Sequence, residues 1–145
     1  MLKKLLVAID GTEYSWRALE YAMALAKMNG AEMVVLTVAK EGLTHTPQLP
    51  LESELAGNVN EPAMQVGNDV LGAAKHLIDQ QQIPCSYTLV IGSRPAPEII
   101  KCCLKERCDT IVLGTRGFGA IEGLFKNSVS QAVIENASVP VIVIK

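Results

Sequence analysis

The chain has 145 residues, of which 49% are hydrophobic and 19% are charged. This length favours a single domain over residues 1–145, and the composition excludes an unstructured chain. Thirteen basic and fifteen acidic residues give a net charge of −2 without any basic stripe, so nucleic acid is not an expected partner. The first apolar run stops at Asp10, far short of the roughly 20 residues that cross a bilayer, so we expect neither a membrane partner nor a signal peptide.

Short apolar runs rich in β-branched residues predict buried strands of a parallel sheet, because strands covered on both faces lose the alternation of apolar and polar residues. The runs are Leu5–Ile9, Met33–Val38, Tyr87–Ile91, Thr110–Leu113 and Val141–Ile144.

Helical periodicity separates these runs. Helices are expected over residues 12–28, 62–82 and 95–106, and from Asn127-Ser128 to about Asn136. The alternation predicts an α/β fold, a single open doubly wound five-stranded parallel sheet with helices on both faces, Rossmann-like, with strand order 3-2-1-4-5. The apolar positions predict which helical side chains are buried: Val66, Val70, Ala73, Ala74, Leu77 and Ile78 in the second helix, and Ile99, Ile100, Cys103 and Leu104 in the third.

A glycine-rich segment follows the fourth strand, with glycines at 114, 117, 119 and 123. Ser128 and Ser130 open the next helix, whose free N–H groups and hydroxyls would favour an anion. The segment therefore predicts a phosphate cradle at the switch point of the sheet, although the glycines alone are equally consistent with a tight loop. Neither GxxxxGK[ST] nor GxGxxG occurs there, since Glu122 stands where the second pattern requires glycine.

The chain resembles the universal stress proteins over essentially its whole length. The resemblance rests on a first strand that ends in Asp10, the helix beginning around Ser15, and a final strand with Val139-Pro140-Val141. The ATP-binding branch of that family has Gly, two residues, Gly, nine residues, and then Gly followed by Ser or Thr. Here Gly114, Gly117 and Ser128 fit that motif, whereas Asn127 replaces its third glycine.

The resemblance implies a bound ATP or AMP and identifies the residues around it. Val38 would contact adenine, and Asp10 would accept from ribose or hold Mg²⁺, although Asp10 is equally consistent with a turn residue before the helix. The last residues of the neighbouring strands would complete the nucleotide pocket, and the segment after the fourth strand would hold phosphate: Ala8, Ile9, Leu113, Gly114, Arg116, Gly117, Asn127, Ser128, Val129 and Ser130.

Three functions remain open at this point. The first is a nucleotide-binding stress-response or signalling module with little or no turnover, and the second is a dimeric interaction module of the same fold without nucleotide. The third is a slow ATPase, for which no residue stands at a spacing that assigns a catalytic base.

Similar proteins dimerise through the last strand, so we expect a homodimer joined through Val141–Ile144. Cys85, Cys102, Cys103 and Cys108 form no CxxC pair and are expected to be reduced thiols in a cytoplasmic protein.

Overall fold

The computed structural model describes residues 2–40, 61–115 and 129–145, and along them strands and helices alternate as predicted. The strands are β1 (Lys4–Ala8), β2 (Glu32–Lys40), β3 (Cys85–Gly92), β4 (Thr110–Gly114) and β5 (Val141–Ile144). The helices are α1 (Glu13–Asn29), α2 (Glu61–Asp79), α3 (Pro95–Glu106) and α4 (Val129–Asn136).

These strands form one parallel sheet in the order β3-β2-β1-β4-β5, which confirms the predicted topology. The central strands are buried on both faces, which explains why their sequences are continuously apolar. β3 and β5 are the edge strands of this order and are only partly buried.

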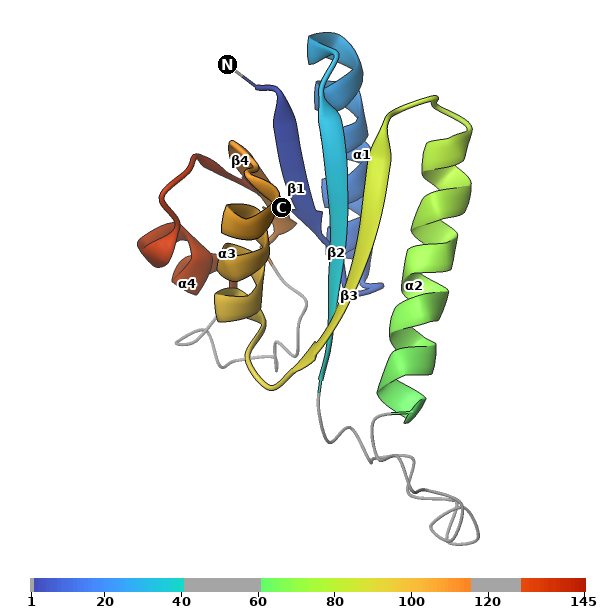
Figure 1. Ribbon diagram of the computed structural model, residues 1–145, viewed down its shortest axis with the longest axis vertical. Coiled ribbons are helices and arrows are strands. Elements are labelled where there is room, and N and C mark those ends of the chain that lie inside the picture. The colour runs from blue at the N-terminus through green and yellow to red at the C-terminus, as the bar shows by residue number, and fades with distance from the viewer. Residues whose placement is uncertain (1, 41–60, 116–128) are drawn as a thin grey trace, which may run out of the picture.

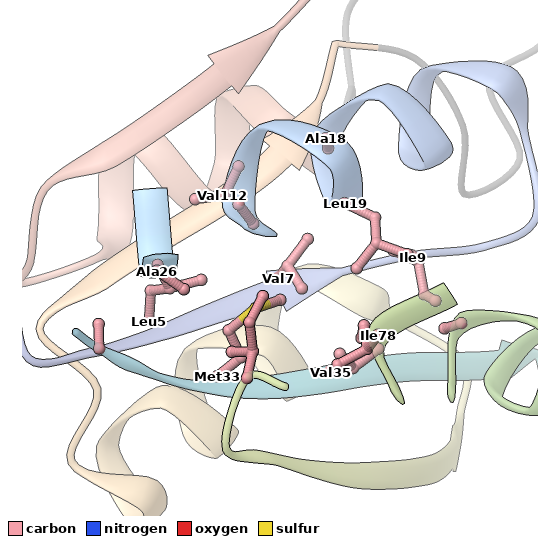
Figure 2. Packing of buried hydrophobic residues seen from close by; sticks show 14 residues of the cluster. Leu5, Val7, Ile9, Ala18, Leu19, Ala26, Met33, Val35, Ile78 and Val112 are labelled. Atoms are coloured by element: carbon pink, nitrogen blue, oxygen red, sulfur yellow. The ribbon is translucent and has the colours of Figure 1, made fainter. Parts of the chain in front are cut away.

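Alternate residues of the central strands enter two separate hydrophobic layers. Leu5, Val7 and Ile9 pack with α1 and α2, while Leu6 and Ala8 pack with α3 and α4. Figure 2 shows the first layer, in which Ala18 and Leu19 of α1 lie against the β1 side chains. Figure 1 shows α2 on the right of the sheet and α3 and α4 on the left. The carboxyl ends of the strands therefore lie between two helical layers, one formed by α1 and α2 and the other by α3 and α4.

Helix α1 begins and ends where the sequence indicates. Thr12 is its N-cap, and the Thr12 hydroxyl accepts a hydrogen bond from the Ser15 amide. Gly30 ends the helix in the left-handed conformation with φ of 63°, which glycine adopts without steric cost.

Some helical side chains were predicted on the wrong face. In α2 the buried positions are Ala63, Gly67, Ala74 and Ile78, whereas Val66 and Leu77 are 59% and 42% exposed. The buried stripe is narrow because α2 packs mainly over β2 and β3, at one edge of the sheet. Ala73, which was predicted in that stripe, is exposed as well.

In helix α3, too, one side chain that was predicted to be buried is exposed. Leu104 is 62% exposed, while Ile99, Cys102 and Cys103 are buried against the sheet. The spacing of those three residues defines the covered face, and Leu104 falls outside it. The predicted start of the last helix at Asn127-Ser128 lies outside the described residues.

Candidate functional site

A cavity of about 290 Å³ lies where β1 and β2 end, at the lower end of the sheet in Figure 1. Its strand wall comes from Thr37, Val38, Ala39 and Lys40 of β2 and from Asp10, directly after β1. Carboxyl ends of parallel strands at a switch in strand order are the usual ligand position in this kind of sheet. Sequence analysis predicted Asp10 and Val38 to share one site, and the structure brings them together.

Helix α2 supplies the opposite wall of the cavity. Ala63, Val66, Gly67 and Val70 line it from the first half of that helix. Gly67 permits close packing of the helix, since a Cβ there would lie 2.4 Å from Cδ1 of Leu89 in β3. Sequence analysis missed this wall, although a glycine inside an apolar helical pattern was a signal for close approach.

The turn after β1 holds the Asp10 carboxylate in a fixed position. Its Oδ1 accepts hydrogen bonds from the Thr12 amide at 2.9 Å and from the Thr12 hydroxyl at 2.6 Å. The Asp10 amide in turn donates to Oγ of Ser15 at 3.2 Å. Gly11 has φ of +87°, a conformation that side chains rarely adopt. Asp10 thus shapes the turn and also borders the cavity.

The peptide groups of β2 extend beyond the end of β1. The Leu36 carbonyl faces β1, where it accepts from the Ile9 amide at 2.9 Å. Successive peptide groups of a strand point to opposite sides, so the N–H and C=O of Val38 face the same way as those of Leu36. The paired register of β1 ends at Ala8 opposite Leu36, and β1 therefore offers Val38 no partner. A donor and an acceptor at Val38 are directed past the end of β1.

The predicted contribution of Ala8 and Ile9 is limited by their own contacts. Both side chains are fully buried, on opposite faces of the sheet. The Ile9 amide donates to Leu36, and the Ile9 carbonyl accepts from the buried Thr37 hydroxyl at 2.7 Å. These residues support the cavity and are absent from its lining.

The second half of the predicted site follows β4. Leu113 is buried in the core, and a Cβ on Gly114 would lie 2.9 Å from main-chain atoms of Tyr14. Gly114 therefore lets α1 approach β4. At the start of α4, the Ser130 hydroxyl donates to the Thr115 carbonyl at 3.5 Å, and Val129 packs against the core. The other residues predicted here lie outside the described ranges: Arg116, Gly117, Asn127 and Ser128.

Within residues 2–40, 61–115 and 129–145, no three His, Cys, Asp or Glu side chains gather in a way that could hold a metal ion. A magnesium ion bound mainly through phosphate oxygens and one carboxylate needs no such cluster, and Asp10 is the carboxylate that lines the cavity. None of the described helices is long and apolar enough to span a membrane.

The whole sequence, residues 1–145, matches the universal stress protein family. The chain belongs to the universal stress protein family. One curated relative, a universal stress protein of Thermus aquaticus encoded beside a sulfhydrylase gene, is 32% identical with full coverage of both chains. The universal stress protein YxiE of Bacillus subtilis is 28% identical, also with full coverage of both chains.

Solved structures of universal stress proteins share this fold. The protein UspA of Lactobacillus plantarum superposes with a TM-score of 0.77 at 23% identity, covering 99% of this chain and 98% of its own. A protein of Archaeoglobus fulgidus in complex with dAMP gives 0.70 at 20% identity, covering 100% and 98%. A universal stress protein in complex with cAMP gives 0.68 at 19% identity, covering 99% and 96%.

Proposed function

We propose that this universal stress protein binds an adenine nucleotide, ATP or AMP, in the cavity between β2 and α2. It would act as a stress-response or signalling module with little or no turnover. The observation that carries the proposal is the peptide group of Val38, directed past the end of β1 beside the cavity. The dAMP and cAMP complexes of related proteins support the ligand class.

Adenine matches the two main-chain groups of Val38. Its N1 accepts a hydrogen bond and its exocyclic amine donates one, so the Val38 N–H and C=O are complementary to that edge of the base. Val66 and Val70 provide apolar surface for the ring, and the cavity of about 290 Å³ is near the lower end of small-molecule sites. In this proposal the position of the base fixes the direction of the sugar.

The remaining nucleotide groups would extend along the strand ends. Asp10 would accept from a ribose hydroxyl or hold Mg²⁺ with the phosphates, since its position is fixed by the Thr12 contacts. Lys40 lines the same cavity and offers a cation. By the family motif, the phosphates would contact the segment between β4 and α4: Gly114, Arg116, Gly117, Asn127, Ser128, Val129 and Ser130.

The decisive test compares AMP with IMP on protein stripped of bound nucleotide. IMP presents an acceptor and a donor in the reverse order at the same edge, so both Val38 groups would face an unmatched partner. An unmatched buried hydrogen-bonding group costs about 1–3 kcal/mol, which corresponds to roughly 5- to 150-fold weaker binding. Isothermal titration calorimetry should show that preference for AMP. Equal affinities would contradict readout by Val38, and no binding of AMP or ATP would contradict the proposed function.

A pair of variants on α2 localises the site. Val66→Glu places a negative charge in the cavity and should weaken AMP binding at least about tenfold. Leu77→Glu makes the same change at another exposed position of α2 and should leave the affinity unchanged. If both variants bind AMP like the natural chain, the nucleotide lies elsewhere.

The replacement at Asn127 favours a second candidate, an interaction module of the same fold without nucleotide. Asn127→Gly restores the family motif, so titration of both chains with ATP separates the two functions. Micromolar binding by the natural chain supports the nucleotide proposal. Binding that appears only in the variant supports the interaction module.

We further propose that the domain, residues 1–145, forms a homodimer through β5 in the cytoplasm. β5 ends the described sheet and its apolar residues are only partly buried, and exposed strand edges are usually paired or covered. The four cysteines are free thiols, which fits a reducing compartment.

A further inference from the structure

A second cavity, of about 500 Å³, lies between α3 and α4 and shares no residue with the nucleotide cavity. Figure 1 shows these two helices together on the side of the sheet away from α2. The cavity is built from side chains of the described helices, including Pro97, Ile100 and Leu104 of α3 and Ala132 of α4. We call it the α3/α4 groove.

The α3 side of the groove is an apolar stripe in which Pro97 and Leu104 are exposed and Ile100 is half-buried. Pro97, Ile100 and Leu104 follow one another at spacings of three and four residues, so they share one face of the helix. Leu104 is 62% exposed, while the neighbouring face of α3 is buried in the core. A large aliphatic side chain in a concave surface is a candidate anchor point for a partner.

Among the residues that the structure describes, the charged side chains that line the groove have a single sign. They are Arg94 and Lys101, and no carboxylate of that part of the chain lines it. Both side chains are exposed, and neither forms an ion pair with any residue of the ranges that the structure describes. Glu98, between them in sequence, lies near Gly92, where a Cβ would be 3.3 Å from Cγ of Glu98. A chain with net charge −2 thus presents a local positive apolar groove.

We propose that the α3/α4 groove binds an acidic peptide segment of a partner protein. An aliphatic or aromatic side chain of the segment packs between Ile100, Leu104 and Ala132, and its carboxylates pair with Arg94 and Lys101. Charged pairs at the edge of an apolar contact select the partner, while the contact itself supplies much of the affinity.

Other macromolecules fit the groove less well. Single-stranded nucleic acid requires aromatic side chains for base stacking, and none of the described residues that line the groove is aromatic. Anionic membranes are bound by clusters of about four to eight basic residues, whereas the groove has Arg94 and Lys101.

The larger groove between α1 and α2, about 820 Å³, does not favour an acidic peptide in the same way. Its cations are already engaged, Arg17 by Glu13 at 2.6 Å and Lys27 by the Gln81 side chain at 2.9 Å.

The test is a selection of a displayed random peptide library on the full chain. Bound phage are counter-selected on the Arg94→Glu/Lys101→Glu variant, in which the charge of the groove is reversed. We expect enriched sequences that combine Asp or Glu with Leu, Ile or Phe. Enriched sequences without acidic residues, or no enrichment over the counter-selection, would overturn the proposal.

The most enriched peptide is then labelled with fluorescein and titrated by anisotropy. Lys101→Glu and Leu104→Ala should each weaken binding of the peptide at least about tenfold, and raising the salt concentration should weaken its binding further. Lys105→Glu is the matched control, because Lys105 is also exposed on α3 and does not line the groove. Thermal unfolding of each variant verifies that the fold is retained.

Equal affinity of the peptide for the natural chain and the Lys101→Glu variant would overturn the proposal. So would loss of binding in Lys105→Glu as large as in Lys101→Glu. Cosedimentation with vesicles of phosphatidylcholine and phosphatidylserine, abolished by Arg94→Glu/Lys101→Glu, would replace the peptide by a membrane surface and overturn it as well.

Discussion

At the scale of single residues, Thr37 connects the core to the cavity in which we propose that the nucleotide binds. Its side chain is buried, and its hydroxyl donates to the carbonyl of Ile9 across the end of β1. The Ile9 carbonyl lies just beyond Ala8, where the paired register of β1 with β2 ends. Thr37 thereby holds Ile9, the residue that follows β1, against β2 and next to Asp10.

Thr37→Val should destabilise the protein by about 1–3 kcal/mol, because the valine keeps the shape of the side chain and leaves the buried Ile9 carbonyl unpaired. Urea unfolding followed by circular dichroism measures this. Thr88→Val is the matched control on β3, since Thr88 forms no side-chain hydrogen bond with the residues that the structure describes. A similar loss in both variants would show that the hydrogen bond is not its cause.

The buried cysteines should react slowly with thiol reagents. Burial raises the pKa of Cys108 to about 12, with a further increase from nearby Cys103. Burial also raises the pKa of Cys102 and of Cys103. Near pH 8 the reactive thiolate of Cys108 is then roughly 10³-fold rarer than for a free cysteine, and its rate should increase as the pH rises towards 12.

Kinetics with an aromatic disulfide reagent at several pH values test this. Cys85 is partly exposed, so the first thiol to react should disappear in Cys85→Ser, and urea should release the others. Reaction of Cys108 as fast as Cys85 in the native protein would contradict the prediction.

At the scale of elements, the approach of α1 to β4 determines where Asp10, at the border of the proposed nucleotide cavity, lies. Tyr14, in the first turn of α1, lies over Gly114 at the end of β4. The turn Asp10-Gly11-Thr12 precedes that first turn, so the same packing fixes Asp10. Gly114 has a structural role in this protein whether or not a phosphate approaches it.

Gly114→Ala should destabilise the protein by about 1–3 kcal/mol, since its Cβ would lie 2.9 Å from Tyr14 main-chain atoms and α1 would have to move. The control is Gly72→Ala on the exposed face of α2, where a Cβ meets nothing within 4 Å. That change should stabilise the protein by about 0.5–1 kcal/mol. Differential scanning calorimetry of both variants is the measurement, and an unchanged melting temperature for Gly114→Ala would contradict the packing argument.

At the scale of the whole molecule, β5 leaves one edge of the described sheet open. The Pro140 carbonyl accepts from the Ile111 amide of β4 at 3.0 Å, and the Ile144 carbonyl accepts from the amide of Thr115, just after β4, at 2.8 Å. The peptide groups of Val141 and Val143 therefore point away from β4, towards the open edge. A second copy of the chain would pair with those groups.

Val143→Pro should convert the proposed dimer into a monomer, because proline removes one outward N–H and leaves the bonds to β4 in place. Val143→Ala loses comparable packing but keeps that N–H, so it should remain dimeric. Sedimentation velocity at micromolar concentration distinguishes the two. A dimer in both variants, or a monomeric natural chain, would contradict pairing through β5.

The sequence predicted the parts of the molecule that depend on local pattern. Apolar runs such as Thr110–Leu113 predicted strands because burial on both faces demands them, and Asn29-Gly30 predicted a helix end because glycine adopts the left-handed conformation. The pairing of Asp10 with Val38 in one site was implied by the resemblance to the universal stress proteins, and it agrees with parallel topology, in which the carboxyl ends of neighbouring strands meet at one edge of the sheet.

Tertiary structure decided what depends on neighbours distant in sequence. Val66 and Leu104 read as core residues by periodicity, yet each lies beyond the area that the sheet covers, and both line cavities instead. The α2 wall at Gly67 and the contact of Gly114 with Tyr14 exist only because separate elements pack together. The sequence by itself determined which elements form and in what order, since local periodicity encodes burial. Which faces remained open for ligands was decided by how the elements cover one another.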